Sequence, residues 1–288
     1  MPYTPGASLG GLSATLGSVA LGAVDAAGVA WFLQTLEGWD SPETRAEFTD
    51  REGDHGAWAS PVYLGSRPIT LAGTIDAPSQ AALETAMEQL RVAAGLTDTL
   101  LTVWQTVPKQ CLVRRSGKPL LQYITDTKAL FSVMVTAEDP RRYSTVQQSG
   151  TTGLPVTTGG LLFPAVAPFV FSASGATGTI AAANEGSFET RPVLTVAGPV
   201  VAPLLSALYA DGTVRQLTYS QTLQSGEQLV IDTDARTVLL NGVSRRRFLT
   251  VAQGWPTIPA ASSVTFQFQS STYSATATLT AAWRSAWM

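Results

Sequence analysis

The sequence contains very few of the residue types that usually carry chemistry. It has one cysteine, Cys111, and one histidine, His55, in 288 residues. A disulfide within the chain is therefore excluded, and so is a zinc site built from several cysteines. Because covalent and metal-dependent catalysis lose most of their usual side chains, we predict no catalytic, cofactor-binding or metal-binding residue.

Charge is also scarce. Only 14% of the residues are charged, well below the fraction of about a quarter that is typical of soluble domains. The formal net charge is -3, whereas binding to the phosphate backbone of a nucleic acid usually needs a concentrated basic face. We therefore predict no nucleic-acid specificity. A hydrophobic fraction of 45% with so few charges is typical of a folded chain that covers surface against partners.

The N-terminus has no charged side chain over residues 1–24, and it has no Lys/Arg-rich start. Glycines interrupt this stretch repeatedly, at Gly10, Gly11, Gly17 and Gly22. A signal peptide and a spanning helix both fit such a segment poorly, so we predict no membrane span. We expect an N-terminal arm over residues 1–28 that packs on another surface.

Several well-known sequence motifs are missing as well. The chain contains no phosphate-binding G-x-x-x-x-G-K-[ST] loop, no G-x-G-x-x-G before a helix, no H-E-x-x-H and no G-x-S-x-G elbow. An enzyme that works through carboxylates alone, as glycosidases do, stays open as an alternative.

What is present is mostly a hydrophobic period of two. Val29, Trp31 and Leu33 fall on one side of their segment, and further segments alternate in the same way at 67–75, 100–107 and 130–139. This pattern predicts half-buried strands.

One segment has a helical period instead. Within residues 79–94 the apolar side chains recur at steps of three and four, at Leu83, Met87, Leu90 and Ala94. Pro78 lies near the start, where a missing N–H costs little, and Gly95 is placed to end the helix. We predict one amphipathic helix of about four turns against the sheet of a first domain over residues 29–145.

The composition changes after this domain, because residues 143–184 carry no charge and are rich in Gly, Thr, Ser, Ala and Pro. We interpret residues 146–160 as a linker or extended arm and residues 161–288 as a second domain. The apolar stretch 161–174 is either its first strands or a contact surface. Strand and turn signals then recur at intervals of about eight to twelve residues, the spacing of an all-β sandwich.

Residues 229–246 look at first like a cation site, because Asp232 and Asp234 flank a threonine. An EF-hand loop needs further oxygen ligands, a glycine at the bend and a distal glutamate, and these are absent. Aspartates in turns bond to their own backbone, and Asn241-Gly242 suits a two-residue hairpin. The pattern predicts a three-stranded meander.

The run Arg245–Arg247 and the single cysteine have ordinary interpretations. On a strand at most two of the three arginines point the same way, so they form a weak phosphate patch, and we favour a solvated or interface role. Cys111 lies in an apolar, strand-like context and is expected to be a small packed residue.

His55 is surrounded by acids, namely Asp50, Glu52 and Asp54. An acid beside a histidine can serve as a general-base pair, but the run is turn-like and bounded by glycines. We favour a charged surface loop.

The order of these features resembles that of a known family. In sequence they are "GWD" at 38–40, "GDHG" at 53–56, "RPITLAGTI" at 67–75, "AEDPRR" at 137–142, "NEGSFETRPVLTVAG" at 184–198, "LVIDTDARTVLLNG" at 229–242 and "GW" at 254–255. From Val29 to the C-terminus the chain resembles the distal tail proteins of long-tailed, non-contractile phages.

The resemblance implies a mainly β fold and a structural role. The first domain would be a β-sandwich or split barrel with one α-helix that builds a hexameric ring, and the second a galectin-like β-sandwich. The protein would be a virion component of the tail tip or baseplate, assembled in the host cytoplasm, without catalytic activity or cofactor. Its partners would be the tail tube protein, a tail-tip hub or tail-associated protein, and receptor-binding or fibre proteins.

The alternative hypothesis comes from another class. A galectin-like sandwich can also be a carbohydrate-binding module or a lectin-like adhesin, with Trp255, Trp283 or Trp287 stacking on the sugar rings of a glycan. Because fold alone does not decide function, this alternative stays open at the level of the sequence.

Overall fold

The computed structural model describes residues 12–156 and 177–288. It divides into two compact units, one formed by Met1–Thr145 with Met288 and the other by Val146–Trp287. The first part of the expected N-terminal arm, residues 1–11, lies outside the described residues. The end of the expected linker and the apolar stretch at 161–174 lie outside them too.

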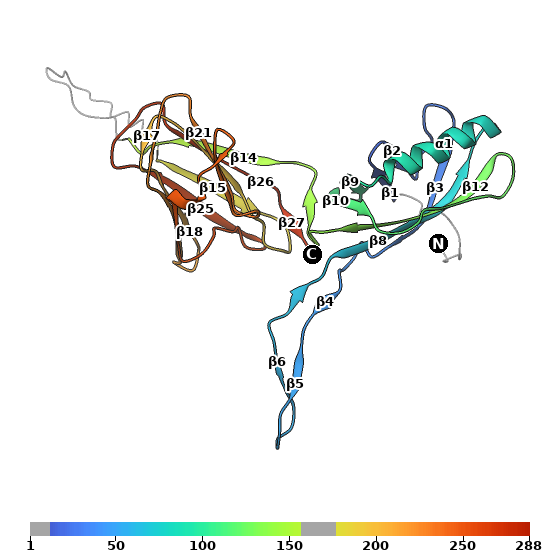
Figure 1. The fold of residues 1–288 in the computed structure, drawn as a ribbon, viewed down its shortest axis with the longest axis horizontal. Coiled ribbons are helices and arrows are strands. Elements are labelled where there is room, and N and C mark those ends of the chain that lie inside the picture. Colours follow the sequence, from blue (N-terminus) through green and yellow to red (C-terminus); the bar gives the residue numbers. More distant parts are fainter. Residues whose placement is uncertain (1–11, 157–176) are drawn as a thin grey trace, which may run out of the picture. The chain divides into compact units, whose positions relative to one another are not determined.

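The first unit is a curved antiparallel sheet with one helix on its face (Figure 1). Its main strands follow the order β2-β1-β9-β10-β12-β8-β3, and β11 pairs with β12. Their bounds are β1 (Ser13–Leu16), β2 (Val19–Leu21), β3 (Ala30–Glu37), β8 (Arg67–Asp76), β9 (Thr99–Trp104), β10 (Lys109–Arg115), β11 (Leu120–Tyr123), β12 (Lys128–Ala137) and β13 (Arg142–Ser144).

The expectation of an N-terminal arm is wrong for residues 12–28. β1 pairs with both β2 and β9, and Leu16 and Leu21 are fully buried. The amide of Gly22 donates to Trp31 O at 2.8 Å, and the amide of Trp31 donates to Ala23 O at 2.9 Å. This segment is therefore part of the sheet, because its short β-branched and leucine-containing runs find cross-strand partners that the sequence does not reveal.

The predicted helix is α1, Gln80–Ala93. Ser79 Oγ accepts the amide of Ala82 at 3.3 Å and so caps the N-terminus. The apolar stripe predicted from the sequence is buried, including Leu83 and Leu90 at 0% exposure. The helix covers the core of the first unit, where the rings of Trp31 and Phe131 meet edge to face at 6.1 Å.

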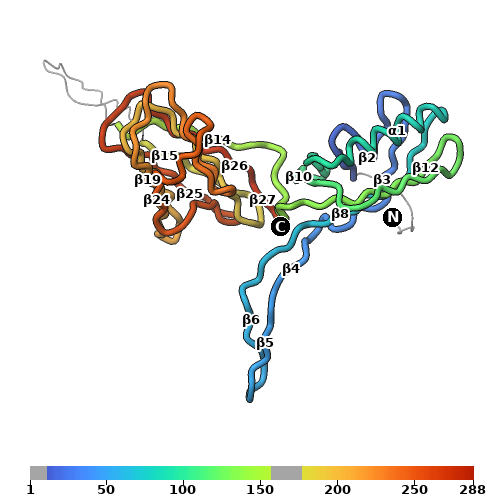
Figure 2. Tube along the Cα trace, in the orientation of Figure 1, coloured from blue at the N-terminus to red at the C-terminus, as the bar shows by residue number. Residues whose placement is uncertain are grey.

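Between β3 and β8 the chain forms a long two-stranded projection, which we call the arm (residues 41–66). Two short ladders hold it, β4 (Thr44–Arg45) with β7 (Tyr63–Leu64) and β5 (Phe48–Asp50) with β6 (Ala57–Ala59). The tube in Figure 2 shows the arm leaving the sheet between β3 and β8 and turning back at its tip.

The second unit is an antiparallel β-sandwich. One sheet has the order β14-β26-β16-β21-β22-β23 and the other β15-β25-β18-β19-β24. The bounds are β14 (Gln148–Gly153), β15 (Thr179–Asn184), β16 (Val193–Ala197), β17 (Val200–Val201), β18 (Leu204–Leu208), β19 (Val214–Tyr219), β20 (Thr222–Leu223), β21 (Gln228–Asp232), β22 (Thr237–Leu240), β23 (Val243–Ser244), the 3₁₀ helix η1 (Arg246–Phe248), β24 (Leu249–Ala252), β25 (Ser262–Gln269), β26 (Thr278–Trp283) and β27 (Ala286–Trp287).

The prediction of a linker is wrong over residues 148–153. This segment is β14, which pairs with β26 over its whole length. The polar and glycine-rich composition suited an edge strand, whose outward face needs no apolar side chains. On its inner side Gly150 lies against Ile180 of the opposite sheet, and the core of the sandwich is closed by alternating inward residues such as Phe266, Phe268 and Leu279.

Candidate assembly interface

The first unit exposes an apolar row on the side of the sheet that faces away from its core. We call it the outer face. It follows from strand alternation, since β12 buries Phe131, Val133 and Val135 while the residues between them point outward. The outer face consists of Phe32, Leu100, Trp104, Leu112, Leu130 and Met134, which are between 37% and 62% exposed.

The strand register brings four of these side chains together in two groups. Leu100 of β9 stands directly opposite Leu112 of β10, and Leu130 of β12 and Phe32 of β3 both face Thr74 of β8. Large apolar side chains exposed on one face of a sheet are typical of sites of protein interaction. The outer face is therefore a candidate contact surface.

The arm is the second candidate surface. Phe48, Trp58, Val62 and Tyr63 are between 59% and 67% exposed. Trp58 carries the Arg51 guanidinium over its ring, with Cζ 4.5 Å from the centroid. An isolated two-stranded hairpin is marginally stable in water, so aromatic side chains left open on one indicate that a partner covers them.

The arm is also acidic. Residues 41–66 contain five carboxylates and two arginines. The tip turns through Gly53 and Gly56, both at positive φ. Asp50, Glu52 and Asp54 have no ion-pair partner among the described residues. The arm thus offers both apolar and negative surface.

Arg67 fixes the base of the arm. Its side chain is fully buried, and its guanidinium donates to Pro140 O at 2.8 Å, Trp39 O at 2.8 Å and Gly38 O at 3.2 Å. Burial, and then the nearby Arg142, lower the pKa of Arg67 to about 10. Gly38 has positive φ, and a Cβ there would lie 2.0 Å from Pro68 O. Both ends of the arm are therefore held rigidly.

His55 lies at the tip of the arm, where it is exposed. Its amide donates to Asp54 Oδ1 at 2.7 Å. The prediction of a charged surface loop is confirmed, but the sequence analysis did not predict that the loop ends a projecting arm. The sequence signal that could have indicated the arm is the length of the connection that contains residues 41–66, because long connections in compact domains are usually functional.

The meander predicted over residues 229–246 is confirmed as β21, β22 and β23. Asp232 Oδ1 accepts the amides of Asp234 and Ala235 at 2.8 and 3.0 Å, and Asp234 Oδ1 accepts from Arg191 at 2.6 Å. Asn241 has the positive φ that the hairpin requires. No three His, Cys, Asp or Glu side chains gather as metal ligands anywhere in the described part of the chain.

Cys111 is a packed residue of β10, as predicted, and it is 3% exposed. The assumption of a strand for Arg245–Arg247 is wrong, because η1 begins at Arg246. A 3₁₀ turn does not send successive side chains to opposite faces, and Arg246 and Arg247 are both exposed.

The tryptophans proposed for sugar stacking are buried or half-buried. Trp283 is 7% exposed, and its Nε1 donates to Ala183 O at 2.7 Å. Trp255 and Trp287 are half-buried, and the ring of Trp255 has the Arg246 guanidinium at 5.1 Å. Trp283 therefore offers no open ring face to a saccharide.

Comparison with known proteins shows what the chain is similar to in sequence and in fold. Residues 185–287 match the family model of the siphovirus-type tail component, C-terminal domain. The second unit is therefore similar in sequence to the C-terminal domain of siphovirus-type tail components. No curated protein is similar enough in sequence to count as a relative.

A solved structure extends the likeness of fold beyond the matched domain. The SPP1 Dit protein (gp 19.1), described as a paradigm of the hub adsorption apparatus in phages that infect Gram-positive hosts, has 11% identity and a TM-score of 0.66. The likeness covers 96% of this chain and 99% of that one. The phage P2 baseplate in its activated conformation with Ca has 8% identity and a TM-score of 0.48, covering 91% of this chain and 99% of that one.

These findings confirm the resemblance to the distal tail proteins, the mainly β fold and the role of a structural phage tail protein. The location is the virion tail. Among the residues that the structure describes, no helix is long and apolar enough to cross a membrane.

Proposed function

We propose that the protein is the subunit of a hexameric ring at the distal end of the tail, where it joins the tail tube to the tail-tip hub. Receptor-binding or fibre proteins are further partners of this assembly. The protein is assembled into the tail in the host cytoplasm, and its role is structural rather than catalytic.

The arm is the observation that carries this proposal. A ring requires heterologous contacts, in which one patch of a subunit meets a different patch of the next. The arm supplies such a patch, because Phe48, Trp58 and Tyr63 are between 63% and 67% exposed. Its base is held by Arg67, so the arm is presented in a defined direction to a neighbouring subunit.

The outer face supports a second set of contacts. It is apolar and lies on the strands of the first unit, so it differs from the arm in position and in charge. Obligate interfaces are more apolar than ordinary surface. The outer face therefore suits a stable contact with a neighbouring subunit, with the tube or with the hub.

The proposal is tested by measuring the mass of the full chain in solution with light scattering and by imaging the same sample in negative stain. We expect six-fold rings with a central hole. The double variant Trp58→Ser/Tyr63→Ser should lose the ring and keep its secondary structure, because it removes exposed aromatic area that only a neighbour covers.

Tyr273→Ser is the matched control, since Tyr273 is an aromatic residue of the second unit with 56% exposure. It should leave the ring intact. A wild-type chain that stays monomeric, also when mixed with tail tube and hub proteins, would contradict the ring. A ring that persists in the double variant would contradict the role of the arm.

A further inference from the structure

The second unit carries a group of arginines whose guanidinium groups lie against aromatic rings. We call it the arginine corner. It lies along β24, the edge strand of the sheet β15-β25-β18-β19-β24, and is formed by the β18–β19 hairpin, by η1 before β24 and by the segment after β24. Its ring contacts are those of Arg215 with Tyr209, Arg246 with Trp255 and Arg247 with Phe248. Arg245, the neighbour of Arg246 in the chain, is counted with them.

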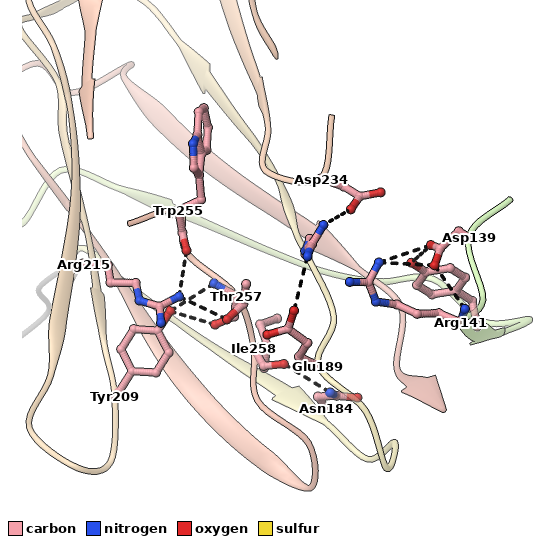
Figure 3. A network of polar contacts seen from close by, with 12 residues as sticks. Asp139, Arg141, Asn184, Glu189, Tyr209, Arg215, Asp234, Trp255, Thr257 and Ile258 are labelled. Carbon is pink, nitrogen blue, oxygen red and sulfur yellow. Dashed lines mark hydrogen bonds and ion pairs between the residues drawn. The ribbon is translucent and has the colours of Figure 1, made fainter. Parts of the chain in front are cut away.

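Arg215 is held at the centre of this group. Its Nη1 donates to Trp255 O at 2.8 Å and to Thr257 Oγ1 at 3.3 Å, and its Cζ lies 5.1 Å from the Tyr209 ring centroid. The hydroxyl of Tyr209 donates to Thr257 O at 2.9 Å and accepts the amide of Thr257 at 3.0 Å. Figure 3 shows the guanidinium between the Tyr209 ring and the backbone of Trp255 and Thr257. Its orientation is therefore fixed.

The neighbouring arginines are arranged by the same means. Arg246 lies 5.1 Å from the Trp255 ring, and its Nη1 donates to Leu249 O at 2.8 Å. Arg247 lies 4.5 Å from the Phe248 ring. Stacking on an aromatic face orients a guanidinium and leaves the edges of its fork free to donate.

None of these arginines forms an ion pair with a carboxylate in the described part of the chain. Arg215, Arg245, Arg246 and Arg247 form no ion pair with any described residue. Asp211 feels Arg215, but its pKa is lowered mainly by the hydrogen bond from the Thr213 amide, at 2.8 Å. Because these guanidinium groups have no carboxylate in an ion pair, they are available to bind an external anion.

The basic residues of the second unit are unusual in kind. Residues 146–287 contain seven arginines and no lysine, and four of the seven are in the arginine corner. Arginine differs from lysine in presenting a planar fork that binds carboxylate and phosphate oxygens in pairs. The corner is therefore suited to oxyanions rather than to negative potential alone.

We propose that the arginine corner binds an anionic polysaccharide through its phosphate or carboxylate groups. A protein partner would need an apolar centre to its interface, whereas exposed large apolar side chains near the corner are few, chiefly Leu208 and Val243. A flexible, hydrophilic polyanion can bind without an apolar interface centre, because its charged groups need only a series of oriented cations. This site is separate from the arm and does not depend on ring formation.

The test measures binding of the full chain to two polyanions, poly(glycerol phosphate) and polygalacturonate, with neutral dextran as the reference. We expect binding to one or both polyanions, weakening as salt is added, and none to dextran. The two polymers separate phosphate from carboxylate recognition, and either preference supports the proposal.

Arg246→Ala/Arg247→Ala should weaken binding by about tenfold or more, since a hydrogen bond to a charged group contributes about 1.5 to 3 kcal/mol. Arg246→Lys keeps the charge but loses the fork, and should also bind more weakly. The matched control is Arg114→Ala/Arg115→Ala in β10, which removes two adjacent arginines from the first unit and should bind as the wild type does.

Three results would overturn the proposal. They are an absence of binding to both polyanions, equal binding by the Arg246→Ala/Arg247→Ala variant and the wild type, and a loss of self-association in that variant without loss of polyanion binding. The last would make the corner a contact between protein subunits.

Discussion

At the scale of single residues, burial decides what the few reactive groups can do. Cys111 points into the core of the first unit, and removal from water raises the pKa of its thiol to about 12 from an ordinary value of 9.0. The nearby Arg67 and Arg142 act in the opposite direction but are outweighed. The thiol is therefore neutral in the folded protein at physiological pH, and chemically quiet.

This shift predicts a pH dependence of stability. A group whose pKa is raised on folding contributes stability below its unfolded pKa, and that stability is lost as pH rises through the folded pKa. We expect the contribution of Cys111 to fall between about pH 9 and 12. The measurement is the free energy of unfolding of the wild type and of Cys111→Ala across this window, since the difference isolates the thiol from other titrating groups.

The same residue offers a simpler check. A thiol reagent at pH 8 should label Cys111 only after denaturation. Rapid labelling of the native chain would show that the thiol is accessible, and the burial argument would then be wrong.

At the scale of elements, close approach between strands constrains the sheet that carries the arm. Gly73 of β8 faces β3, and a Cβ at this position would lie 1.8 Å from Phe32 O and 3.1 Å from Phe131 Cε1. The pairing of β3 with β8 also shifts register between Leu33 and Thr35. A side chain at Gly73 would push apart the two strands from which the arm leaves.

Gly73→Ala should therefore destabilise the first unit by about 1 to 3 kcal/mol, the usual cost of overpacking. Gly117→Ala is the matched control, because a Cβ there would meet Met134 at an ordinary 3.5 Å. Thermal unfolding of both variants decides the point. If the two variants melt together, the close contact at Gly73 is not what constrains this strand pair.

The arm and the 3₁₀ turn η1 show what an element can do beyond its local geometry. In both, a short irregular segment gathers side chains that a regular strand would separate. The arm carries Trp58 and its acids on a two-stranded projection, and η1 lets Arg246 and Arg247 reach aromatic rings on the same corner. The arm and the arginine corner thus depend on departures from regular sheet.

At the scale of the whole molecule, the chain has two separate hydrophobic cores. One is formed by residues between Ala14 and Ala137 and the other by residues between Leu154 and Trp283. Each contains many fully buried aliphatic side chains, so each unit holds enough core to fold as a unit of its own.

We therefore expect two calorimetric transitions, each sensitive to its own core. Leu83→Ala should reduce the free energy of unfolding of the first unit, and Phe266→Ala that of the second unit, each by about 2 to 5 kcal/mol, because each leaves a cavity in a well-packed interior. The calorimetric transition of the affected unit should move to a lower temperature. Both residues are at most 1% exposed. The scans should be run on dilute protein, since assembly stabilises whichever unit forms the contacts. Equal shifts of both transitions by either variant would show a single cooperative unit.

The sequence by itself determined the elements whose pattern is local. The helix at Gln80–Ala93, the buried faces of β3 and β8, and the meander through Asp232 and Asn241 follow from periods of two and 3.6 and from turn residues. The scarcity of cysteine and histidine likewise disfavours metal-dependent and covalent catalysis and favours a structural role.

Only the tertiary structure decided which segments far apart in the chain meet. It placed β1 beside β9 and β14 beside β26, so two stretches that looked like arms are strands. It also placed Arg215 against the backbone of Trp255 and set Arg67 under the base of the arm. Long-range pairing is fixed by the complementarity of whole surfaces rather than by the order of neighbouring residues, and no local period encodes it. The proposed contact surfaces arise from that pairing.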